Sequence, residues 1–550
     1  MATSPPMDLD NPFQRDKLLQ LRTSKMQKMH NLSILTGIYK QPRASRVFCS
    51  FTGLESDEHD LTFHGGLDKA VHQYYPGHYP LWRSELPDSN GSFDIGGFGE
   101  NLVSDNMNER NVCIGDVISI GDVVLQVSLP RQPCFKLNHR FGLKGFAPQT
   151  WKKSRTGWYY RVLKEGWMGV GDDIILVERK HPSWTIERVQ EYLHRDKQNM
   201  PMLEQLVQID EFGNECKKAF RRLLAAAKAQ HEGATKVPEV WQEFVVIEKK
   251  RQTPRIVSFL LEAAVKGSSP GNDLDPGSFV RVKLPNGLIR SYSIVNGTTH
   301  RIQLGVALAA TGSSRGGSEY MHSSLQEGAT ILCGKVTKSV PIREQASNHI
   351  FIAGGIGITA FLAQTAIYTK INFNYVLHYA VRSASDIPFR PLIEEMGSKV
   401  VVYDQSQGQR MDISAILQNR IWNSYIYVCG PPRMIDAVQR AAAAHNIGDD
   451  EIHYEAFQAE RGGDPFTVQV RGHEDKIMDV GPDESLLEVL RREGWSVESS
   501  CEVGNCGTCQ VSVCEGTVEH RGVPLCEHRE GNKAMLSCVS RGLGHLVVGF

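Results

Sequence analysis

Four cysteines near the carboxyl end of the chain have the spacing of metal ligands. Cys501 and Cys506 are separated by four residues, Cys506 and Cys509 by two, and Cys538 follows after another 28. Four thiolates can hold a pair of irons, and the small residues between the first three cysteines let backbone amides approach the sulfurs. The alternative is a structural zinc site, but zinc is usually bound by two closely spaced cysteine pairs. The spacing therefore predicts a [2Fe-2S] cluster with these four cysteines as its metal ligands.

A strand with an alternating polar face could bind a flavin. In the run RSYSIVNG, Arg290 and Tyr292 fall on one face of the strand and Ser293 on the other. Such a strand offers a cation for a phosphate, an aromatic ring for the isoalloxazine and polar atoms for its edge. An ordinary half-buried strand would show the same alternation, so these residues alone leave both interpretations open.

Two glycine-rich turns follow buried strands farther along the chain. The strand HIFIA runs into the turn at residues 354–359, and the strand that ends at Cys429 runs into Gly430 and Pro431. Glycines permit close approach of the backbone to a diphosphate, and a helix N-terminus attracts anions. Neither turn is a full GxGxxG fingerprint. Two such turns on one parallel sheet nevertheless predict a nucleotide-binding crevice at its carboxyl edge.

Composition and charge exclude several classes of protein. The chain has 550 residues, of which 41% are hydrophobic and 22% charged, and its net charge is -1. It is therefore long enough for several domains and is neither disordered overall nor strongly charged. No run approaches 18 apolar residues, and the N-terminus lacks the apolar core of a secretion signal. We expect a cytoplasmic protein with no nucleic-acid partner and no membrane partner.

The order of strand-like and helix-like segments predicts the domains that position these residues. Short β-type runs separated by turns predict mainly-β domains, and strands that alternate with helix-length segments predict a parallel α/β sheet. Apolar residues at three-to-four spacing predict helices between the two mainly-β regions. The predicted regions are a flexible N-terminal tail over residues 1–30, a mainly-β domain over 31–180, a three-helix unit over 181–233, an antiparallel β-barrel over 238–343, an α/β domain over 344–458 and a cysteine-rich domain over 464–550.

Residues 240–550 resemble the phthalate dioxygenase reductase family, within the wider ferredoxin reductase superfamily. The motifs are RSYS at 290–293, SRGGS at 314–318, GGIGIT at 354–359, CGPP at 429–432 and the plant-type ferredoxin cysteines. The resemblance implies a flavin-binding barrel, a NAD-binding α/β domain and an α+β ferredoxin domain. It also implies that Cys429 is a catalytic residue beside the nicotinamide. The cofactor-binding residues that it implies are Arg290, Tyr292, Ser293, Gly316, Gly317, Ser318, Gly354, Gly355, Gly357, Thr359, Gly430 and Pro431.

The same resemblance bears on the identity of the flavin and of the electron donor. Family members with this domain order use FMN, so we expect FMN rather than FAD. It also favours NADH over NADPH. Arg382 and Ser383 could contact a 2′-phosphate, which keeps NADPH open as the alternative.

Residues 33–178 resemble the MOSC domain, named for the C-terminus of molybdenum cofactor sulfurase. The matching segments are HGGLDKAVHQY at 64–74, FGENL at 98–102, IGDVISIGD at 114–122 and PRQPCFKL at 130–137. The three-helix unit is similar to a segment of bacterial MOSC proteins that reduce N-hydroxylated compounds. The resemblance implies that Cys134 is a catalytic thiolate ligand of molybdenum, although a single cysteine is more commonly a packing residue. It further implies that the cofactor contacts His64, Asn101, Arg131 and Lys136.

Together these features predict a self-contained oxidoreductase. Electrons would pass from NADH through the flavin and the cluster to a molybdenum cofactor at Cys134, which would reduce a small N-hydroxylated substrate. One alternative is a reductase for an external oxygenase, with the MOSC domain as a sulfur or cofactor carrier. Another is a non-enzymatic MOSC module that only localises a reductase. A homodimer, with electron transfer between chains, is compatible with each of these hypotheses.

Overall fold

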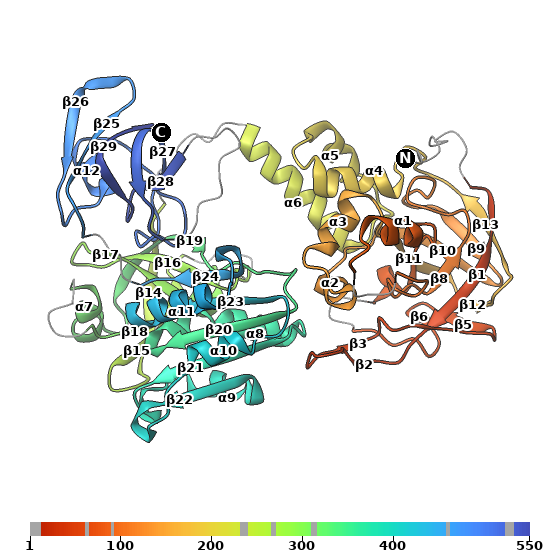
Figure 1. Ribbon diagram of the computed structural model, residues 1–550, viewed down its shortest axis with the longest axis horizontal. Coiled ribbons are helices and arrows are strands. Elements are labelled where there is room, and N and C mark those ends of the chain that lie inside the picture. The colour runs from red at the N-terminus through yellow and green to blue at the C-terminus, as the bar shows by residue number, and fades with distance from the viewer. Residues whose placement is uncertain are drawn as a thin grey trace. The chain divides into compact units, whose positions relative to one another are not determined.

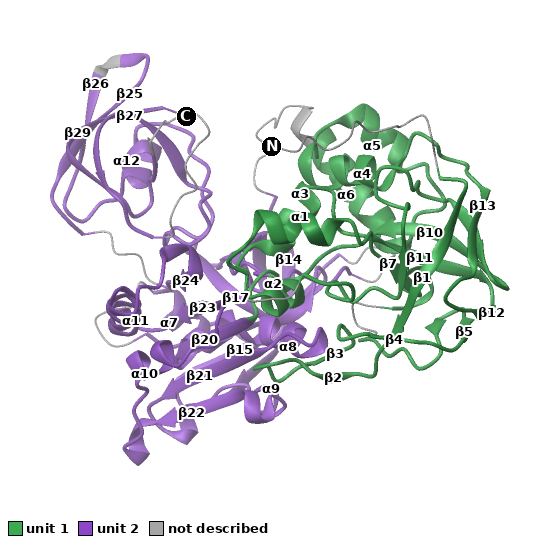
Figure 2. Cartoon of the chain, turned by 45° about the vertical axis from the view of Figure 1, so that its right-hand side comes forward, with its two compact units in different colours: residues 1–237, 344–347 green, residues 238–343, 348–550 purple. Residues whose placement is uncertain are grey.

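The computed structural model divides the chain into two compact units. It describes residues 13–60, 65–89, 93–231, 240–265, 271–309, 316–457, 462–522 and 533–549. Unit 1 contains residues 1–237 and 344–347, and unit 2 contains residues 238–343 and 348–550 (Figure 2). In the described part of the chain, no helix is both long enough and apolar enough to cross a membrane. The predicted linker residues Glu460 and Arg461, and the predicted contact His64, lie outside the described residues.

Unit 1 is built around an eight-stranded sheet that closes on itself through β1 and β13. The strand order is β13-β9-β10-β11-β7-β8-β1-β4, and the bounds are β1 Arg15–Thr23, β4 Gln41–Pro42, β7 Val71–Gln73, β8 Leu102–Ser104, β9 Val117–Ile120, β10 Val123–Pro130, β11 Trp158–Lys164 and β13 Asp173–Glu178. Smaller sheets are formed by β5 Val47–Ser50, β6 Gly53–Leu54 and β12 Gly166–Met168, and by β2 Gln27–Lys28 and β3 Leu35–Thr36. The helices α1 His78–Glu85, α2 Phe135–Phe141 and α3 Phe146–Lys152 interrupt the strands (Figure 1).

The prediction of a flexible tail over residues 1–30 is wrong from Phe13 onward. Strand β1 pairs with both β8 and β13, so it is an integral strand of the closed sheet. Leu18 and Leu21 are fully buried in the core of unit 1. The charged residues at the start of the strand lowered the apparent hydrophobicity of the segment, and Leu19, which lies between the two buried leucines, is exposed. Strand pairing and the burial of Leu18 and Leu21 outweigh that composition.

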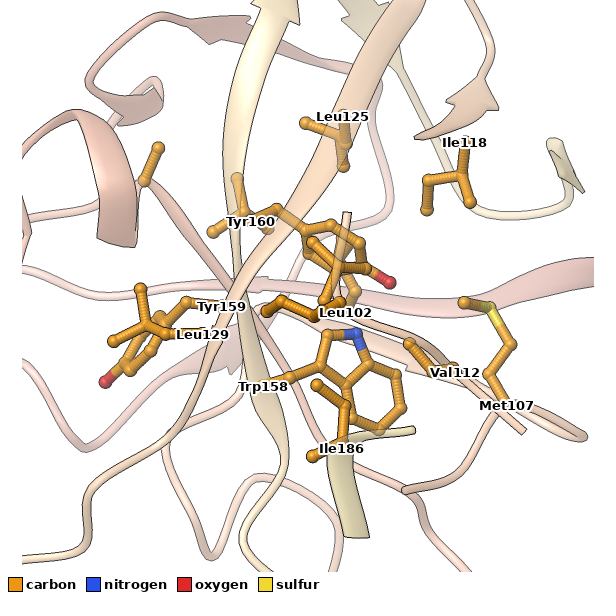
Figure 3. Packing of buried hydrophobic residues seen from close by; sticks show 14 of the residues in the cluster. Leu102, Met107, Val112, Ile118, Leu125, Leu129, Trp158, Tyr159, Tyr160 and Ile186 are labelled. Atoms are coloured by element: carbon orange, nitrogen blue, oxygen red, sulfur yellow. The ribbon is translucent and has the colours of Figure 1, made fainter. Parts of the chain in front are cut away.

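The three-helix unit shares the hydrophobic core of the closed sheet. Its helices are α4 Ile186–Gln190, which continues into a π-helical turn, α5 Met200–Leu206 and α6 Asn214–His231. Ile186 lies beside Trp158 from β11, and both side chains are fully buried (Figure 3). The helical unit therefore packs its apolar face into the same core as the MOSC-like strands.

Unit 2 contains the three other predicted domains. The closed barrel has the order β14-β15-β18-β17-β16-β19, with β14 Gln242–Arg251, β15 Ile256–Ala263, β16 Ser278–Lys283, β17 Ile289–Thr298, β18 Arg301–Ala307 and β19 Thr330–Lys338; α7 spans Gly317–Ser323. The parallel sheet has the order β22-β21-β20-β23-β24, with β20 Asn348–Gly354, β21 Tyr375–Val381, β22 Val400–Asp404, β23 Ser424–Cys429 and β24 Ile452–Glu455. Its helices are α8 Leu362–Lys370, α9 Arg390–Glu394, α10 Ile413–Gln418 and α11 Pro432–Ala444.

The last domain of unit 2 is a mixed sheet with one helix. The strand order is β26-β25-β29-β27-β28, with β25 Phe466–Val470, β26 His473–Val480, β27 Gln510–Glu519, β28 Lys533–Leu536 and β29 Arg541–Gly549. Helix α12, Leu486–Arg492, begins at a capping box in which Ser485 and Glu488 satisfy each other's backbone amides. Its leucines pack into the core of this sheet, so the helix fixes where the cysteine loop that follows it begins.

Candidate functional site

The four predicted cluster ligands meet in the last domain as two pairs. Cys501, Cys506 and Cys509 lie on the loop between α12 and β27, and Cys538 follows β28. The Cys501 thiol donates a hydrogen bond to Cys506 and lowers the pKa of that thiol to about 5, and Cys538 likewise lowers the pKa of Cys509. Across the described ranges, no three His, Cys, Asp or Glu side chains surround one point as ligands of a single ion would. Two pairs fit a two-iron cluster, in which each iron takes two thiolates.

Backbone amides are already directed at one of these sulfurs. The amide nitrogens of Val503, Asn505 and Cys506 lie 3.5, 3.3 and 3.4 Å from Sγ of Cys501. Gly504, at φ 86°, makes the left-handed turn that this arrangement requires. Amide donors stabilise a thiolate and raise the potential of the cluster that it ligates, so the loop fits a [2Fe-2S] cluster.

The predicted flavin strand and the predicted phosphate turn meet in the barrel. Arg290 and Tyr292 are half-buried on β17, and Ser293 is buried. Gly317, at the start of α7, lies so close to the Arg290 side chain that a Cβ there would be 2.8 Å from its Cγ. A guanidinium beside a turn of backbone amides is a donor set suited to a phosphate.

The two glycine-rich turns of the parallel sheet contact each other at the carboxyl ends of β20 and β23. A Cβ on Gly357 would lie 2.2 Å from the carbonyl oxygen of Cys429, and one on Gly430 would lie 2.7 Å from Sδ of Met434. Only glycine fits at position 357, where the clash is with backbone, whereas a side chain at position 430 would require the Met434 side chain to move. Gly355 to Ala360 form a 3-10 helix before α8, so the helix opens more tightly than the sequence predicts. The Thr359 hydroxyl donates to the Ile356 carbonyl at 2.8 Å and helps to hold this turn.

Cys429 lies at the end of β23, in the crevice that these turns form. It is fully buried, and burial raises the pKa of its thiol well above the ordinary value, with Glu455 adding to the shift. The thiol is therefore neutral near pH 7. A neutral thiol can pack against a nicotinamide ring without adding charge, whereas a nucleophilic role would need the thiolate.

The candidate molybdenum site is a cavity in unit 1 around Cys134. Cys134 directly precedes α2 and is only half-buried, whereas Cys49, Cys113 and Cys216 are buried in the core. The cavity brings together Cys134, Asn101, Arg131 and Lys136 of the predicted site with Thr36, Gly37, Ile38, Lys40, Asp57, His59, Asp60, Gly65, Lys69, Ala70, His72, Phe98, Gly99 and Tyr159. A cysteine that faces a cavity is placed to bind a ligand rather than to fill a core.

Polar atoms without protein partners face this cavity. Arg131 is 5% exposed, and among the described residues its Nε and Nη1 have no hydrogen-bond partner. His72 also lines the cavity, with Nδ1 3.4 Å from the Gly99 carbonyl, and burial together with the Arg131 charge lowers the pKa of His72 well below its ordinary value. Buried donors of this kind carry a free-energy cost unless a ligand accepts from them. An anionic, hydrogen-bonding cofactor would satisfy them.

Three family models match the chain. They are the MOSC domain at residues 60–175, the YiiM-like, 3-alpha helix domain at 184–227 and the 2Fe-2S iron-sulfur cluster binding domain at 468–541. A protein named "Reductase" from Gibberella moniliformis (strain M3125 / FGSC 7600) is 36% identical over 548 residues, which cover 96% of this chain and 94% of that protein. The chain belongs to the family of this reductase.

Shorter relatives match about half of the reductase. The heme-dependent oxidative N-demethylase beta subunit of Ectopseudomonas mendocina (strain ymp) is 34% identical, over 53% of this chain and 93% of that protein. The carnitine monooxygenase reductase subunit of Acinetobacter baumannii is 31% identical, over 55% and 96%. Among solved structures, phthalate dioxygenase reductase is 25% identical with a TM-score of 0.42, covering 58% of this chain and 99% of that one. YiiM from Geobacillus stearothermophilus is 26% identical with a TM-score of 0.33, covering 38% and 99%.

The chain is thus an NAD(P)H-dependent flavin and [2Fe-2S] oxidoreductase, with a MOSC domain and a three-helix domain in the same polypeptide. When bound, NAD(P)H would supply a hydride, and the flavin and cluster would pass it on as single electrons. The residues that would hold these groups are Arg290 and the turn at Gly317 for a phosphate, the two glycine turns for the dinucleotide, and the paired cysteines for the irons.

Sequence reasoning missed a buried network in the crevice of this reductase. The Ser339 hydroxyl, just after β19, lies 2.8 and 2.7 Å from the two carboxylate oxygens of Glu455 at the end of β24. Nε2 of His453 lies 3.0 Å from the same carboxylate. Glu455 pairs in register with Cys429 on the neighbouring strand. A sequence signal existed, since Glu455 ends a strand of the sheet that carries both glycine turns.

A second network, around Asp57, shapes the cavity of unit 1. Asp57 accepts hydrogen bonds from Nζ of Lys40 at 2.5 Å and from Nδ2 of Asn101 at 2.9 Å. Asn101 also donates to the Arg22 carbonyl at 3.0 Å and accepts from the His72 amide at 3.0 Å. Both amide hydrogens of Asn101 are used within the protein, so Asn101 helps to position the cavity wall, and its predicted contact with a cofactor would have to be made through Oδ1. No local sequence pattern connects Lys40 with Asp57.

Proposed function

We propose that the reductase is a self-contained, molybdenum-dependent N-reductase, in which NADH supplies the electrons and N-hydroxylated small molecules are reduced in unit 1. The observation that carries the proposal is the half-buried Cys134 in a cavity with the unpartnered donors of Arg131. The overall change would be R–NHOH + 2 e⁻ + 2 H⁺ → R–NH2 + H2O. Unit 2 supplies the two electrons, and solvent supplies the protons.

The cavity residues fit a molybdenum cofactor by their chemistry. Cys134 would provide the soft thiolate that anchors the metal, and the metal would supply an acceptor for the oxygen atom of the substrate. Arg131 would donate to the anionic part of the cofactor, and Lys136, 3.6 Å from Asp60, adds a second buried cation. His72 lines the same cavity, and its lowered pKa keeps the ring neutral, so it adds no further positive charge beside Arg131.

We further propose FMN rather than FAD, and NADH rather than NADPH. The pairing of Arg290 with Gly317 supports one phosphate subsite on the barrel. Beyond β21, Oγ of Ser383 lies 3.3 Å from the Asp386 carboxylate. A carboxylate at this position would repel a 2′-phosphate, which supports NADH.

An external redox partner is the alternative that the comparisons favour. Two of the shorter relatives are named as a reductase subunit and a beta subunit, so each is described as one component of a larger system. In that case the flavin and cluster of this chain would reduce a separate oxygenase, and the MOSC domain would have another role.

Anaerobic NADH titration of molybdenum-replete protein, followed by EPR and visible absorption, tests the two functions. We expect stoichiometric molybdenum, sequential reduction of flavin, cluster and molybdenum, and NADH-dependent reduction of N-hydroxylaminopurine at a turnover number independent of protein concentration. Molybdenum that stays oxidised after the cluster is reduced, or N-reduction that needs an added protein, would favour the external partner.

A further inference from the structure

The loop that carries the cluster ligands is held to the end of the parallel sheet by one side chain. Asn505, between Cys501 and Cys506, accepts a hydrogen bond from the Ala456 amide at Oδ1, 3.0 Å away. Its Nδ2 donates to the carbonyl oxygen of the same Ala456 at 2.7 Å. Asn505 is 7% exposed. Its side-chain amide therefore pairs with both polar groups of one backbone residue in another domain of unit 2.

Ala456 lies where three domains of unit 2 meet. It follows Glu455, the last residue of β24, whose carboxylate accepts the Ser339 hydroxyl from the end of the flavin barrel. Glu455 is also in register with Cys429 at the crevice. The dipeptide 455–456 thus connects the barrel, the nucleotide-binding sheet and the cluster loop through side-chain hydrogen bonds.

The cluster loop also contacts the barrel, through two interactions that are weaker than those of Asn505. The hydroxyl groups of Ser500 and Thr337 lie 2.8 Å apart, and Glu502 lies 4.0 Å from Arg281. A single hydroxyl pair and a long ion pair fix the orientation of the loop weakly. The two antiparallel hydrogen bonds of Asn505 define both its distance and its direction.

The Asn505 side chain is not needed to bind the cluster. The contact of this residue with the Cys501 sulfur comes from its backbone amide, 3.3 Å away, which any residue other than proline could provide. The structure thus separates two roles of one residue: its backbone faces the cluster ligand, and its side chain faces a different domain.

We propose that Asn505 is a positioning residue for electron transfer from the flavin to the cluster. Its side chain holds the cluster loop against the junction of barrel and sheet, and so keeps the two centres at a short, constant distance. Electron transfer between centres weakens steeply with distance, so loss of this contact slows that step alone. This inference rests on the flavin and cluster of unit 2 and is independent of molybdenum.

The test is Asn505→Leu in the full-length holoenzyme, with Ser499→Ala as a control. Ser499 contacts Arg491 and Glu502 within the cluster domain, so its loss changes the same region without removing the Asn505 contact. In anaerobic stopped-flow measurements, flavin reduction by NADH should keep its rate, whereas flavin-to-cluster transfer should slow about tenfold, equivalent to about 1.4 kcal/mol, in the range of two net hydrogen bonds. The EPR spectrum and the potential of the cluster should not change.

A second readout does not depend on turnover. Amide hydrogen exchange of the peptide that contains Ala456 should accelerate in Asn505→Leu and not in Ser499→Ala, because the Ala456 amide loses its acceptor. If Asn505→Leu fails to retain the cluster, Asn505→Ala, which also removes both hydrogen bonds but introduces no bulky side chain, takes its place. Wild-type flavin-to-cluster rates in either cluster-replete variant would overturn the proposal.

Discussion

We expect Asp57→Asn to lower the free energy of unfolding of unit 1, because it breaks the buried ion pair between Asp57 and Lys40. The side chains of Asp57 and Lys40 are 1% and 7% exposed. Burial alone would raise the pKa of Asp57, but hydrogen bonds from His59 and Lys40 and the charge of Lys40 outweigh it, so the pKa is lowered. Asp57→Asn removes this charge and leaves buried Lys40 with only the weaker effect of the Glu100 charge to offset its burial. Such a change typically costs about 3–5 kcal/mol, and we expect about 3 because asparagine retains an acceptor for Asn101.

Urea unfolding monitored by peptide-resolved hydrogen exchange measures this effect for each unit. Unit 1 should lose stability in Asp57→Asn, whereas unit 2 should not, because the two units have separate cores. The double variant Lys40→Met/Asp57→Leu should recover part of the loss, since no charge then remains buried. Asp122→Asn is the surface control, because its ion pair with Arg46 is exposed. A loss below about 1 kcal/mol in Asp57→Asn, or no recovery in the double variant, would refute the reasoning.

The pH dependence gives a further check on the same residue. The folded-state pKa of Asp57 lies below the ordinary value of 3.8. Its contribution is therefore complete at pH values above its unfolded-state pKa, and it is lost as the pH falls through the lower folded-state value. The difference in unfolding free energy between wild type and Asp57→Asn should be constant near neutrality and should narrow in acid. A difference that widens on acidification would contradict the assignment of a lowered pKa.

The other predictions address the cofactor sites one at a time. Arg290→Ala should release flavin while changing stability by about 0.5 kcal/mol or less, as measured by flavin content and urea unfolding; full flavin occupancy would argue against the phosphate role. Cys506→Ser should abolish the cluster EPR signal yet leave the rate of flavin reduction by NADH unchanged, since hydride transfer needs only the barrel and the sheet. Cys134→Ser should remove bound molybdenum and N-reductase turnover while ferricyanide reduction persists; turnover with full molybdenum would exclude the ligand assignment.

Local motifs were predicted well from the sequence because their partners lie close in the chain. The three cysteines from Cys501 to Cys509 share one loop, and the glycines at 354–357 share one turn, so spacing alone indicates their role. The order of the domains also followed from the alternation of strands and helices. Strand β1 was missed because an irregularity between Leu18 and Gln20 breaks the alternation of buried and exposed residues, and the burial of Leu18 and Leu21 depends on pairing with strands far along the chain.

The networks that complete the sites could not be predicted from spacing. Lys40 and Asp57 come from different loops, and the partner of the Asn505 side chain is backbone, which carries no sequence signal. The MOSC resemblance assigns Asn101 to the cofactor, but it does not show that the side-chain amide also holds Asp57, Arg22 and His72. Residue type alone does not separate a ligand from the residue that positions it.

Covalent fusion of the two units supports an electron acceptor within the chain. The Gibberella moniliformis reductase matches 96% of this chain, so a second protein carries both units in one polypeptide. Tethering raises the effective concentration of one domain near another to about the millimolar range when the linker permits contact. An electron acceptor in unit 1 would stay tethered to its electron donor, unit 2, at any dilution of the protein. The cavity at Cys134 offers such an acceptor a thiol, cationic side chains and hydrogen-bond donors of Arg131 that have no partner among the described residues.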